Sequence, residues 1–495
     1  MTTTLIKKGY LLDPCLPFER GDILIKNDLI AQVAPDIDFP ADTIINASNK
    51  VILPGLISAH THSFMTWLRG LTDNLPLDSW LLYIGYVMGE RMSLREQYVW
   101  SAIGALELLK NGTTSLVESG PVIGRLEEID NRVDATANAF ADVGIRAAIA
   151  PLYLDLDYSE GHPLHLLGDI KPEHIAPLNL FPPEKAENII QALRGVLRRW
   201  QDDNPRLSLY LGCEPPYRAS RELLEGTVEL ASEFDLGIHM HLLEAKFQVI
   251  ISHKMFSCSP VDYLASINCL GPHVSLAHVI WVDDKDIQVL AETNTSVIHN
   301  PIANLRLGDG IAPVQAMKAR GLNIALGIDD VSNCDSLSMF ESMKFAASIH
   351  KLYGHRSKWI GAQDALTMCL HGGAKVMRKK IGSLQPGCLA DLVILGTDKL
   401  FIIPKEYFIN QLVFGELGSS VETVLVGGHV VIEDKEVKTV NEKELYAEAR
   451  ESMQKLYTDI PSLNKRFAPA LDLLDRMDKA VADYKLPFSR LACLD

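Results

Sequence analysis

The middle of this 495-residue chain alternates strand-like and helix-like segments, and this alternation limits the possible folds more than any other feature. Such alternation is typical of βα units and a parallel sheet. Eight strands predict an α/β fold with a (β/α)8 TIM-like barrel, whose catalytic groups lie at the carboxyl ends of the strands. The alternative is an open doubly wound sheet, but no glycine-rich nucleotide fingerprint follows any strand. The predicted strands are Leu53–His62, Ser115–Glu118, Ile145–Pro151, Leu207–Cys213, Gly237–Leu242, Val274–Val279, Thr295–Asn300 and Asn323–Asp329.

The clearest helix of this middle part is predicted to begin at Ser93. Glu96, three residues later, completes a capping box, and apolar residues recur on one stripe. Gly112 is expected to end the helix.

Both ends of the chain carry short strands and tight turns. Residues 21–33 predict a hairpin around Asn27-Asp28, and residues 424–432 predict a second hairpin around Gly427-Gly428. We therefore expect one small β-sandwich domain assembled from the two ends.

The last part of the chain is charged and helical in pattern. A helix over 440–456 is predicted to end before a break at Pro461, and a second amphipathic segment follows near 468–484. This tail is expected to pack on the barrel or on another subunit. The expected domains are 1–54 and 385–439 for the two parts of the β-sandwich, 55–384 for the barrel and 440–495 for the helical tail.

Composition limits the partners. The net charge of -16 argues against a nucleic-acid partner, because phosphate binding needs a basic surface. The N-terminus has no signal-like apolar region, and no apolar run is long enough for a membrane span. The eight cysteines are scattered without a Cys-x-x-Cys pair, as in reduced core thiols. We expect a cytoplasmic protein that acts on a small molecule and binds neither nucleic acid nor membrane.

His60-Thr61-His62 ends the first predicted strand. Side chains at i and i+2 of a strand point to the same side, roughly 6.5–7 Å apart along the backbone. Two neutral imidazoles at this spacing can bind one divalent ion. Alone, the spacing equally fits two histidines that alternate near a turn.

Polar residues at other predicted strand ends favour the metal interpretation. His241 lies near the end of one strand with Glu244 three residues later, His278 ends another, and Asp329 lies at the tip of an apolar strand. His239 is predicted to be an inner-face histidine outside the site.

Three imidazoles and one carboxylate, with a position left for water, are typical of a catalytic metal site. The metal would lower the pKa of its bound water towards ~7 and give a hydroxide nucleophile. Asp329 could ligate the metal and accept the proton of the water, and Glu244 could pass a proton to a ring nitrogen or leaving group. His278 could polarise the attacked centre or orient the hydroxide.

These motifs resemble the amidohydrolase superfamily, in its branch of S-adenosylhomocysteine/methylthioadenosine deaminases, guanine deaminases and triazine hydrolases. The resemblance covers nearly the whole chain, through Pro54-Gly55, Leu68-Arg69-Gly70, His299-Asn300-Pro301 and Ala390-Asp391 among others. It implies one metal ion, Zn2+ or Fe2+, held by His60, His62, His241 and Asp329, with Glu244, His278 and Asp329 catalytic. It also implies a homodimer or homotetramer.

Departures from this family pattern concern the substrate. No lysine ends the fourth strand, so a mononuclear site is favoured, and Glu214 stands where adenosine-type deaminases usually carry histidine. The Pro-x-Glu that contacts ribose in those enzymes is displaced within Val87–Arg91. Three roles remain open for Glu214. It could face a ligand with N–H donors or positive charge, it could shuttle a proton, or it could reach a second ion. The candidate substrate-binding residues are Glu214, Trp67, Asn304 and Asp330.

The leading hypothesis is a metal-dependent hydrolase that deaminates a purine-, pterin-, pyrimidine- or triazine-like ring and releases ammonia. A triazine-type chloro- or alkylamino-hydrolase, or a cyclic amide hydrolase, would use the same site. A non-catalytic scaffold is the remaining alternative, and it predicts lost metal ligands, whereas all four are present.

Overall fold

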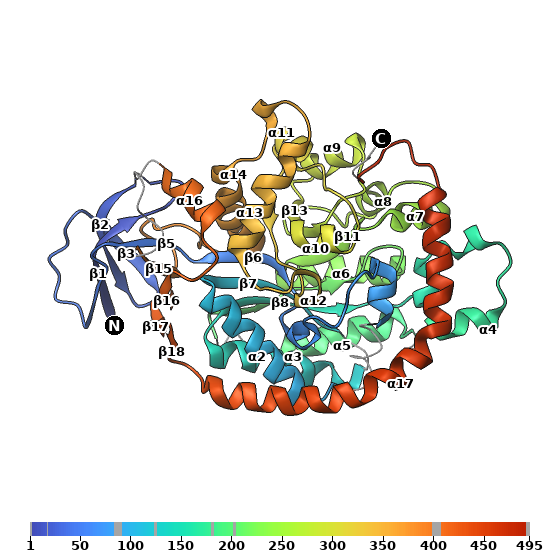
Figure 1. The fold of residues 1–495 in the computed structure, drawn as a ribbon, viewed down its shortest axis with the longest axis horizontal. Coiled ribbons are helices and arrows are strands. Elements are labelled where there is room, and N and C mark those ends of the chain that lie inside the picture. The colour runs from blue at the N-terminus through green and yellow to red at the C-terminus, as the bar shows by residue number, and fades with distance from the viewer. Residues whose placement is uncertain are drawn as a thin grey trace.

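Strands from both ends of the chain form one sheet beside the barrel (Figure 1). The computed structural model describes residues 2–16, 18–83, 92–122, 126–179, 183–200, 204–397 and 407–491. Within these ranges the sheet has the order β18-β17-β16-β15-β5-β1-β2-β3, and β4 pairs with β1. Its strands are β1 (Thr3–Leu11), β2 (Glu19–Lys26), β3 (Leu29–Ala34), β4 (Thr43–Asn46), β5 (Lys50–Pro54), β15 (Leu392–Gly396), β16 (Val421–Val426), β17 (His429–Glu433) and β18 (Glu436–Val437).

Both predicted hairpins are confirmed. Strands β2 and β3 pair antiparallel around Asn27, which has a left-handed φ of +55°. Strands β16 and β17 pair around Gly427 and Gly428, whose φ values of +57° and +74° suit glycine. The two chain ends meet where β15 pairs antiparallel with β5.

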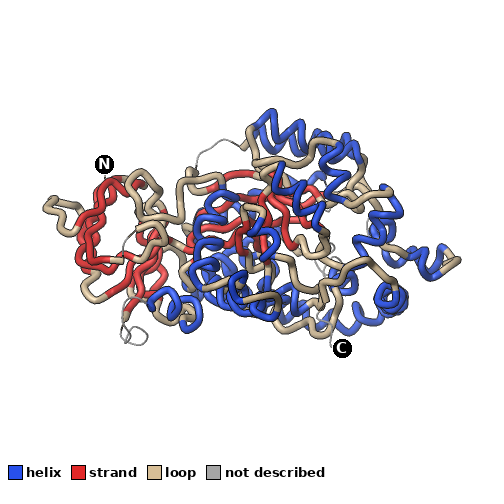
Figure 2. Tube along the Cα trace, turned by 90° about the horizontal axis from the view of Figure 1, so that it is seen from above, coloured by secondary structure: helices blue, strands red, loops and turns tan. Residues whose placement is uncertain are grey.

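All eight predicted barrel strands are present, and Figure 2 shows strands in the middle of this part with helices around them. Neighbouring strands pair in parallel, in the order β10-β8-β7-β6 in one half of the barrel, with β9 beside β8, and β11-β12-β13-β14 in the other half. The parallel bridges Leu211–Ile238 and Thr61–Asp329 connect the two halves. The strands are β6 (Leu56–Thr61), β7 (Thr113–Val122), β8 (Arg146–Tyr153), β9 (Leu207–Leu209) with β10 (Gly212–Cys213), β11 (Ile238–Leu242), β12 (Val274–His278), β13 (Ser296–His299) and β14 (Ile324–Leu326).

The predicted strand Leu53–His62 is in fact two strands. Its first residues belong to β5 in the N-terminal sheet, and those after Gly55 form β6 in the barrel. A Cβ at Gly55 would lie 2.0 Å from the hydroxyl of Thr114, so only glycine allows this close approach. Gly55 is therefore the point where the chain passes from one sheet to the other.

Helices surround the barrel strands. The prediction for α2 is confirmed, since Ser93 and Glu96 form a reciprocal capping box at its start. The helices are α2 (Leu94–Lys110), α3 (Ile129–Val143), α4 (Pro172–Ile175), α5 (Ala186–Arg199), α6 (Arg221–Phe234), α7 (Lys246–Phe256), α8 (Pro260–Ser266), α9 (Asp284–Glu292), α10 (Pro301–Arg306), α11 (Val314–Ala319), α12 (Val331–Cys334), α13 (Met339–Ile349), α14 (Ala362–Thr367), α15 (Gly373–Met377) and α16 (Phe408–Gly415).

The C-terminal tail differs from the prediction. One helix, α17 (Glu442–Asp483), continues through Pro461 and Pro469, so the expected break is absent. Figure 1 shows this helix running along one side of the barrel and then turning to follow the next. A proline removes one N–H and strains the preceding turn, but packing can hold such a helix together. Buried residues on both sides of the prolines, such as Leu445 and Leu474, supply that packing.

Ion pairs join α17 to α2 of the barrel. Arg95 of α2 forms two hydrogen bonds with Glu448, at 2.7 and 2.8 Å, and Lys110 pairs with Glu442. The tail therefore lies on the barrel of its own chain.

Two further expectations concern thiols and membranes. The seven cysteines that the structure describes are all free. Among the described residues, no helix combines the length and apolar character needed to cross a bilayer.

Candidate metal centre and its cavity

Imidazoles and carboxylates from five barrel strands meet at the carboxyl end of the barrel. They line a cavity of about 140 Å3 whose remaining wall is largely apolar, including Leu77, Trp80 and Phe247. Six of the predicted site residues line it, namely His62, Glu214, His241, Glu244, His278 and Asp329. His60 lies fully buried beneath.

A chain of hydrogen bonds sets the orientation of His60. Ser275 Oγ donates to the Ile238 carbonyl at 3.2 Å, so it accepts from Nδ1 of His239 at 2.9 Å. His239 Nε2 then accepts from His60 Nδ1 at 2.7 Å. The Nε2 lone pair of His60 is consequently free, and this buried atom has no hydrogen-bond partner.

His62 has the same tautomer for a simpler reason. Its Nδ1 lies 2.5 Å from the Ser119 carbonyl, which can only accept a hydrogen bond. Its Nε2 therefore also presents a lone pair. His241 directs Nδ1 at Glu214 Oε1, 3.5 Å away, and leaves Nε2 for the centre of the site.

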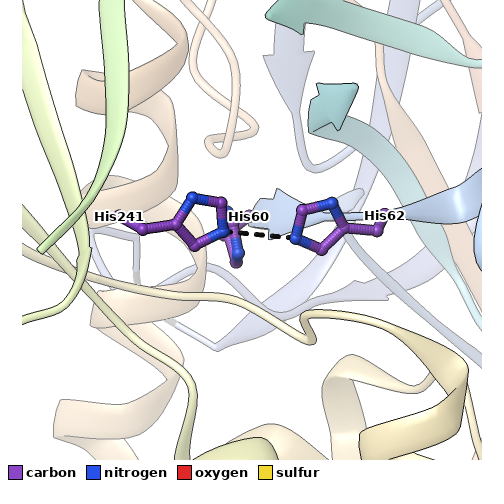
Figure 3. Close-up of side chains that lie close together, drawn as sticks. All are labelled: His60, His62 and His241. Carbon is purple, nitrogen blue, oxygen red and sulfur yellow. Dashed lines mark hydrogen bonds between the residues drawn. The ribbon is translucent and has the colours of Figure 1, made fainter. Parts of the chain in front are cut away.

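Figure 3 shows the imidazoles of His60, His62 and His241 facing one another, and their ligand atoms lie within 4.8 Å of one another. His60, His278 and Asp329 form a second such group, which shares His60 with the first. Nε2 of His62 lies 3.3 Å from Nε2 of His241, and Asp329 Oδ1 lies 3.5 Å from His60 and 3.4 Å from His62. Two nitrogens bound to one tetrahedral zinc would lie roughly 3.3 Å apart. Lone pairs that face each other at this distance repel unless a cation lies between them, so these residues fit a divalent metal ion.

The protonation states agree with this fit. Burial lowers the pKa of His62 to about 4 and the pKa of His60 well below its usual value. Both imidazoles are therefore neutral near pH 7, which is the form that binds metal.

Glu244 and His278 lie together beside the converging ligands. His278 Nδ1 is 2.8 Å from Asn304 Oδ1 and 3.3 Å from Glu244 Oε1, and its Nε2 faces Asp329 Oδ2 at 3.8 Å. Burial, followed by the nearby carboxylate of Asp309, raises the pKa of Glu244 well above its usual range. Glu244 is thus a buried acid that can hold a proton at neutral pH.

Glu214 forms an ion pair inside the cavity. Its carboxylate lies 3.2 Å from Arg218 as well as beside His241. Burial raises the pKa of Glu214, but Arg218 and His241 outweigh this effect and lower it to about 2. Glu214 is therefore ionised, and it faces a metal-ligand candidate and a cation.

Three other predicted substrate contacts lie elsewhere around the site. Asn304 contacts His278 rather than the cavity. Asp330 is buried at the start of α12, where it accepts hydrogen bonds from Ser332 and Asn333, and burial raises its pKa to about 8. Trp67 borders a separate hollow between α2 and α17. The segment Val87–Arg91 lies outside the described residues.

His239 and the Ser119 carbonyl are functional groups that sequence reasoning missed or placed outside the site. The alternation of His239 with His241 puts both on one strand face, which was the available signal. Nothing in the sequence marks a backbone carbonyl. Arg218, four residues after Glu214, could have been noticed as its partner.

Two residues of the site have left-handed backbone conformations. His278 has φ of +71° and Asp329 has φ of +75°. Such conformations cost of order 1–3 kcal/mol and gather where function requires a fixed side-chain direction. Here they turn the two side chains into the site as their strands end.

A parallel barrel with imidazoles and a carboxylate at its carboxyl end is the arrangement of metal-dependent barrel enzymes. The chain belongs to the amidohydrolase family, whose model matches residues 51–431. It is 31% identical to a 5'-deoxyadenosine deaminase of Methanobrevibacter smithii, over 92% of this chain and 98% of the relative. It is also 31% identical to a 5-methylthioadenosine/S-adenosylhomocysteine deaminase of Thermococcus sibiricus, over 86% and 93%.

Solved structures share the fold. An adenosine deaminase from Xanthomonas campestris with bound zinc superposes with a TM-score of 0.81 at 23% identity, over 92% of this chain and 99% of that one. The zinc complex of an atrazine chlorohydrolase from Arthrobacter aurescens gives 0.80 at 22% identity, over 91% and 100%. At these identities the likeness concerns the fold.

Proposed function

We propose that this protein hydrolytically deaminates an amino-substituted nitrogen heterocycle and releases ammonia. The observation that carries the proposal is the convergence of His60, His62 and His241, with Asp329 3.4–3.5 Å from two of them, beside the buried acid Glu244, whose pKa is raised. The two deaminases that resemble the chain over most of its length support the same reaction.

We propose zinc as the metal, held by His60, His62, His241 and Asp329. Imidazole nitrogens with one carboxylate suit zinc, and their separations match tetrahedral coordination. A divalent ion held there would lower the pKa of a bound water towards ~7 and so supply a nucleophile at neutral pH.

The side chains around this point divide the proton transfers between them. Glu244 protonates the ring nitrogen next to the attacked carbon, which reduces the aromatic stabilisation of the ring. Asp329 accepts a proton from the water and passes it to the departing amine. His278, held by Asn304, directs Nε2 toward Asp329 and orients the attacking oxygen. As the amine leaves, the added hydroxyl returns one proton to Glu244. The products are ammonia and the hydroxylated ring in its keto form.

Glu214 has two roles in this proposal. Its carboxylate orients His241 through Nδ1, as a carboxylate commonly orients a metal-bound histidine. Its place on the cavity wall also favours a substrate with N–H donors. The ion pair with Arg218 keeps Glu214 ionised in both roles.

The test is ammonia release by the zinc-loaded protein from purine, pterin, pyrimidine and triazine amines, including 5'-deoxyadenosine and methylthioadenosine. A deaminated product gains about one mass unit relative to its substrate, whereas loss of chloride or alkylamine gives a different mass. The Glu244→Gln variant is the matched control, since it keeps the metal ligands. Absence of ammonia from every compound would contradict the proposal.

We also propose that the protein is cytoplasmic and forms a homodimer or homotetramer, with domains at 1–54 plus 385–439, 55–384 and 440–495. The free thiols support a reducing compartment. Light scattering of the purified chain tests the oligomer, and a monomer would contradict it.

A further inference from the structure

Three side chains with metal-binding atoms meet on the opposite side of the barrel from the catalytic residues. Asp13 and Cys15 follow β1, and His371 lies in the π-helical turn Met368–Gly372. Cys15 Sγ is 3.7 Å from His371 Nε2, and the ligand atoms of all three residues lie within 4.8 Å of one another.

The position of this cluster separates it from the catalytic centre. Gly372, next to His371, packs so closely on Ile324 that a Cβ would lie 2.2 Å from the Ile324 carbonyl. Ile324 begins β14, and Asp329 follows the end of the same strand. The cluster is therefore at the amino end of the barrel, where it contacts the N-terminal segment.

Asp13 is held in place by the surrounding backbone. It is 3% exposed, and its Oδ2 accepts from Leu384 N at 2.6 Å and from Ser383 Oγ at 2.8 Å. Its Oδ1 accepts from Cys15 N at 2.7 Å, which sets the turn that brings Cys15 to His371. The two donors occupy both lone pairs of Oδ2, whereas Oδ1 accepts one hydrogen bond and keeps a lone pair that can bind a cation.

A second thiol lies near this cluster. Cys388 is half-buried and interacts with Ser383, the residue that donates to Asp13. Burial and then the charge of Asp13 raise the pKa of the Cys388 thiol. Cys388 is not among the three residues whose ligand atoms lie within 4.8 Å of one another.

The donor types identify the class of ion. Thiolate and imidazole favour zinc over magnesium or calcium, which prefer oxygen ligands. A sulfur and a nitrogen bound to one tetrahedral zinc lie roughly 3.5 Å apart, close to the distance between Cys15 and His371.

We infer that Asp13, Cys15 and His371 form a second, structural site for a zinc-like divalent cation. The site joins the N-terminal loop to the base of the barrel and to the segment that leads into β15. It is independent of the catalytic metal and of the proposed reaction.

Cobalt provides a test, because only a thiolate ligand adds a sulfur-to-cobalt absorption band in the near ultraviolet. The catalytic ligands are nitrogen and oxygen, so they cannot give this band. Metal-free full-length protein is supplied with Co2+ alone, and the bound ions are counted after desalting. The wild type is expected to bind two ions per chain and show the band.

Variants assign each ion to its site. His241→Ala is expected to bind one ion and keep the band, whereas Cys15→Ser binds one ion and loses it. Cys258→Ser, which changes a thiol outside the cluster, keeps both ions and the band. One ion and no band in the wild type would overturn the inference, as would a band that persists in Cys15→Ser. Should Cys15→Ser fail to fold, the wild type and His241→Ala still decide.

Discussion

Each ligand histidine has its ring orientation set by a partner on Nδ1. His60 donates to His239, His62 donates to a carbonyl, and His241 faces Glu214. These partners leave Nε2 of each ring free for the metal. The affinity for metal should therefore depend on residues that do not touch it.

His239→Ala is expected to lower the metal affinity by about 10–100-fold, because His60 loses the acceptor that fixes its tautomer. Competition with a chelator measures this change. His239→Gln, which restores an acceptor, should recover part of the loss, and His355→Ala, on an exposed histidine, should have no effect. Equal affinity in all of these proteins would exclude the positioning role.

Glu244→Gln is expected to lower kcat by about 10²–10⁴-fold with the metal content unchanged, because it removes a positioned acid. The pKa of Glu244 is raised by burial, so the protonated form is the active one. Activity should fall as the pH rises through this pKa, and the variant should lack that alkaline decline. A pH profile of kcat provides the comparison, and an identical decline in both proteins would remove Glu244 from the role of acid.

At the scale of elements, strand ends and the long tail helix shape the cavity. The backbone turns at His278 and Asp329 direct two side chains inward as β12 and β14 end. Farther out, Asp78 is buried near Asp475 and Asp478 of α17. The tail is therefore linked electrostatically to the segment that carries Trp80 of the cavity wall.

The burial of Asp78 beside α17 should make the stability of the folded protein depend on pH. Burial, followed by Asp478, raises the pKa of Asp78 from 3.8 to about 7. Protonated Asp78 therefore adds up to about 4 kcal/mol to the free energy of unfolding of the protein. This contribution is fully present below about pH 4 and is lost as the pH rises through 7. Thermal unfolding between pH 5 and 8 should show a smaller decline for Asp78→Asn than for wild type. Asp73→Asn, on an exposed acid, should keep the wild-type slope, and a wild-type slope in Asp78→Asn would contradict the prediction.

At the scale of the whole molecule, a buried ion pair joins the barrel to the sheet. Arg146 of β8 binds Asp391 through two hydrogen bonds of 2.6 and 3.0 Å, and Gly427 N donates to the same carboxylate at 2.7 Å. Both charged side chains are almost fully buried. The pair therefore connects three regions that are far apart in sequence.

Asp391→Ala is expected to destabilise the protein by about 3–5 kcal/mol, because it leaves the Arg146 charge buried without a partner. Denaturant unfolding of the metal-loaded protein measures the loss. Glu225→Ala, which removes an exposed ion pair with Arg221, should cost less than about 0.5 kcal/mol. A loss for Asp391→Ala no larger than this control would show that the buried pair is unimportant.

Local patterns predicted the elements but not every boundary. The periodicity of the chain predicted eight barrel strands, and the capping box predicted α2. The predicted strand Leu53–His62 is divided at Gly55, where the backbone approaches Thr114 closely. Helix α17 continues through Pro461 because it packs on the barrel. Both are contacts between distant residues, which local propensity does not contain.

The residue types at the strand ends were enough to predict the metal chemistry, because alternation along a strand and the parallel barrel together bring those ends to one face. The roles of their neighbours required the tertiary structure. It directs Glu214 at His241, links His239 to His60, and moves Trp67 and Asp330 away from the cavity. Hydrogen bonding and burial depend on which segments meet in space, and such meetings also bring Cys15 of the N-terminal part to His371 of the barrel.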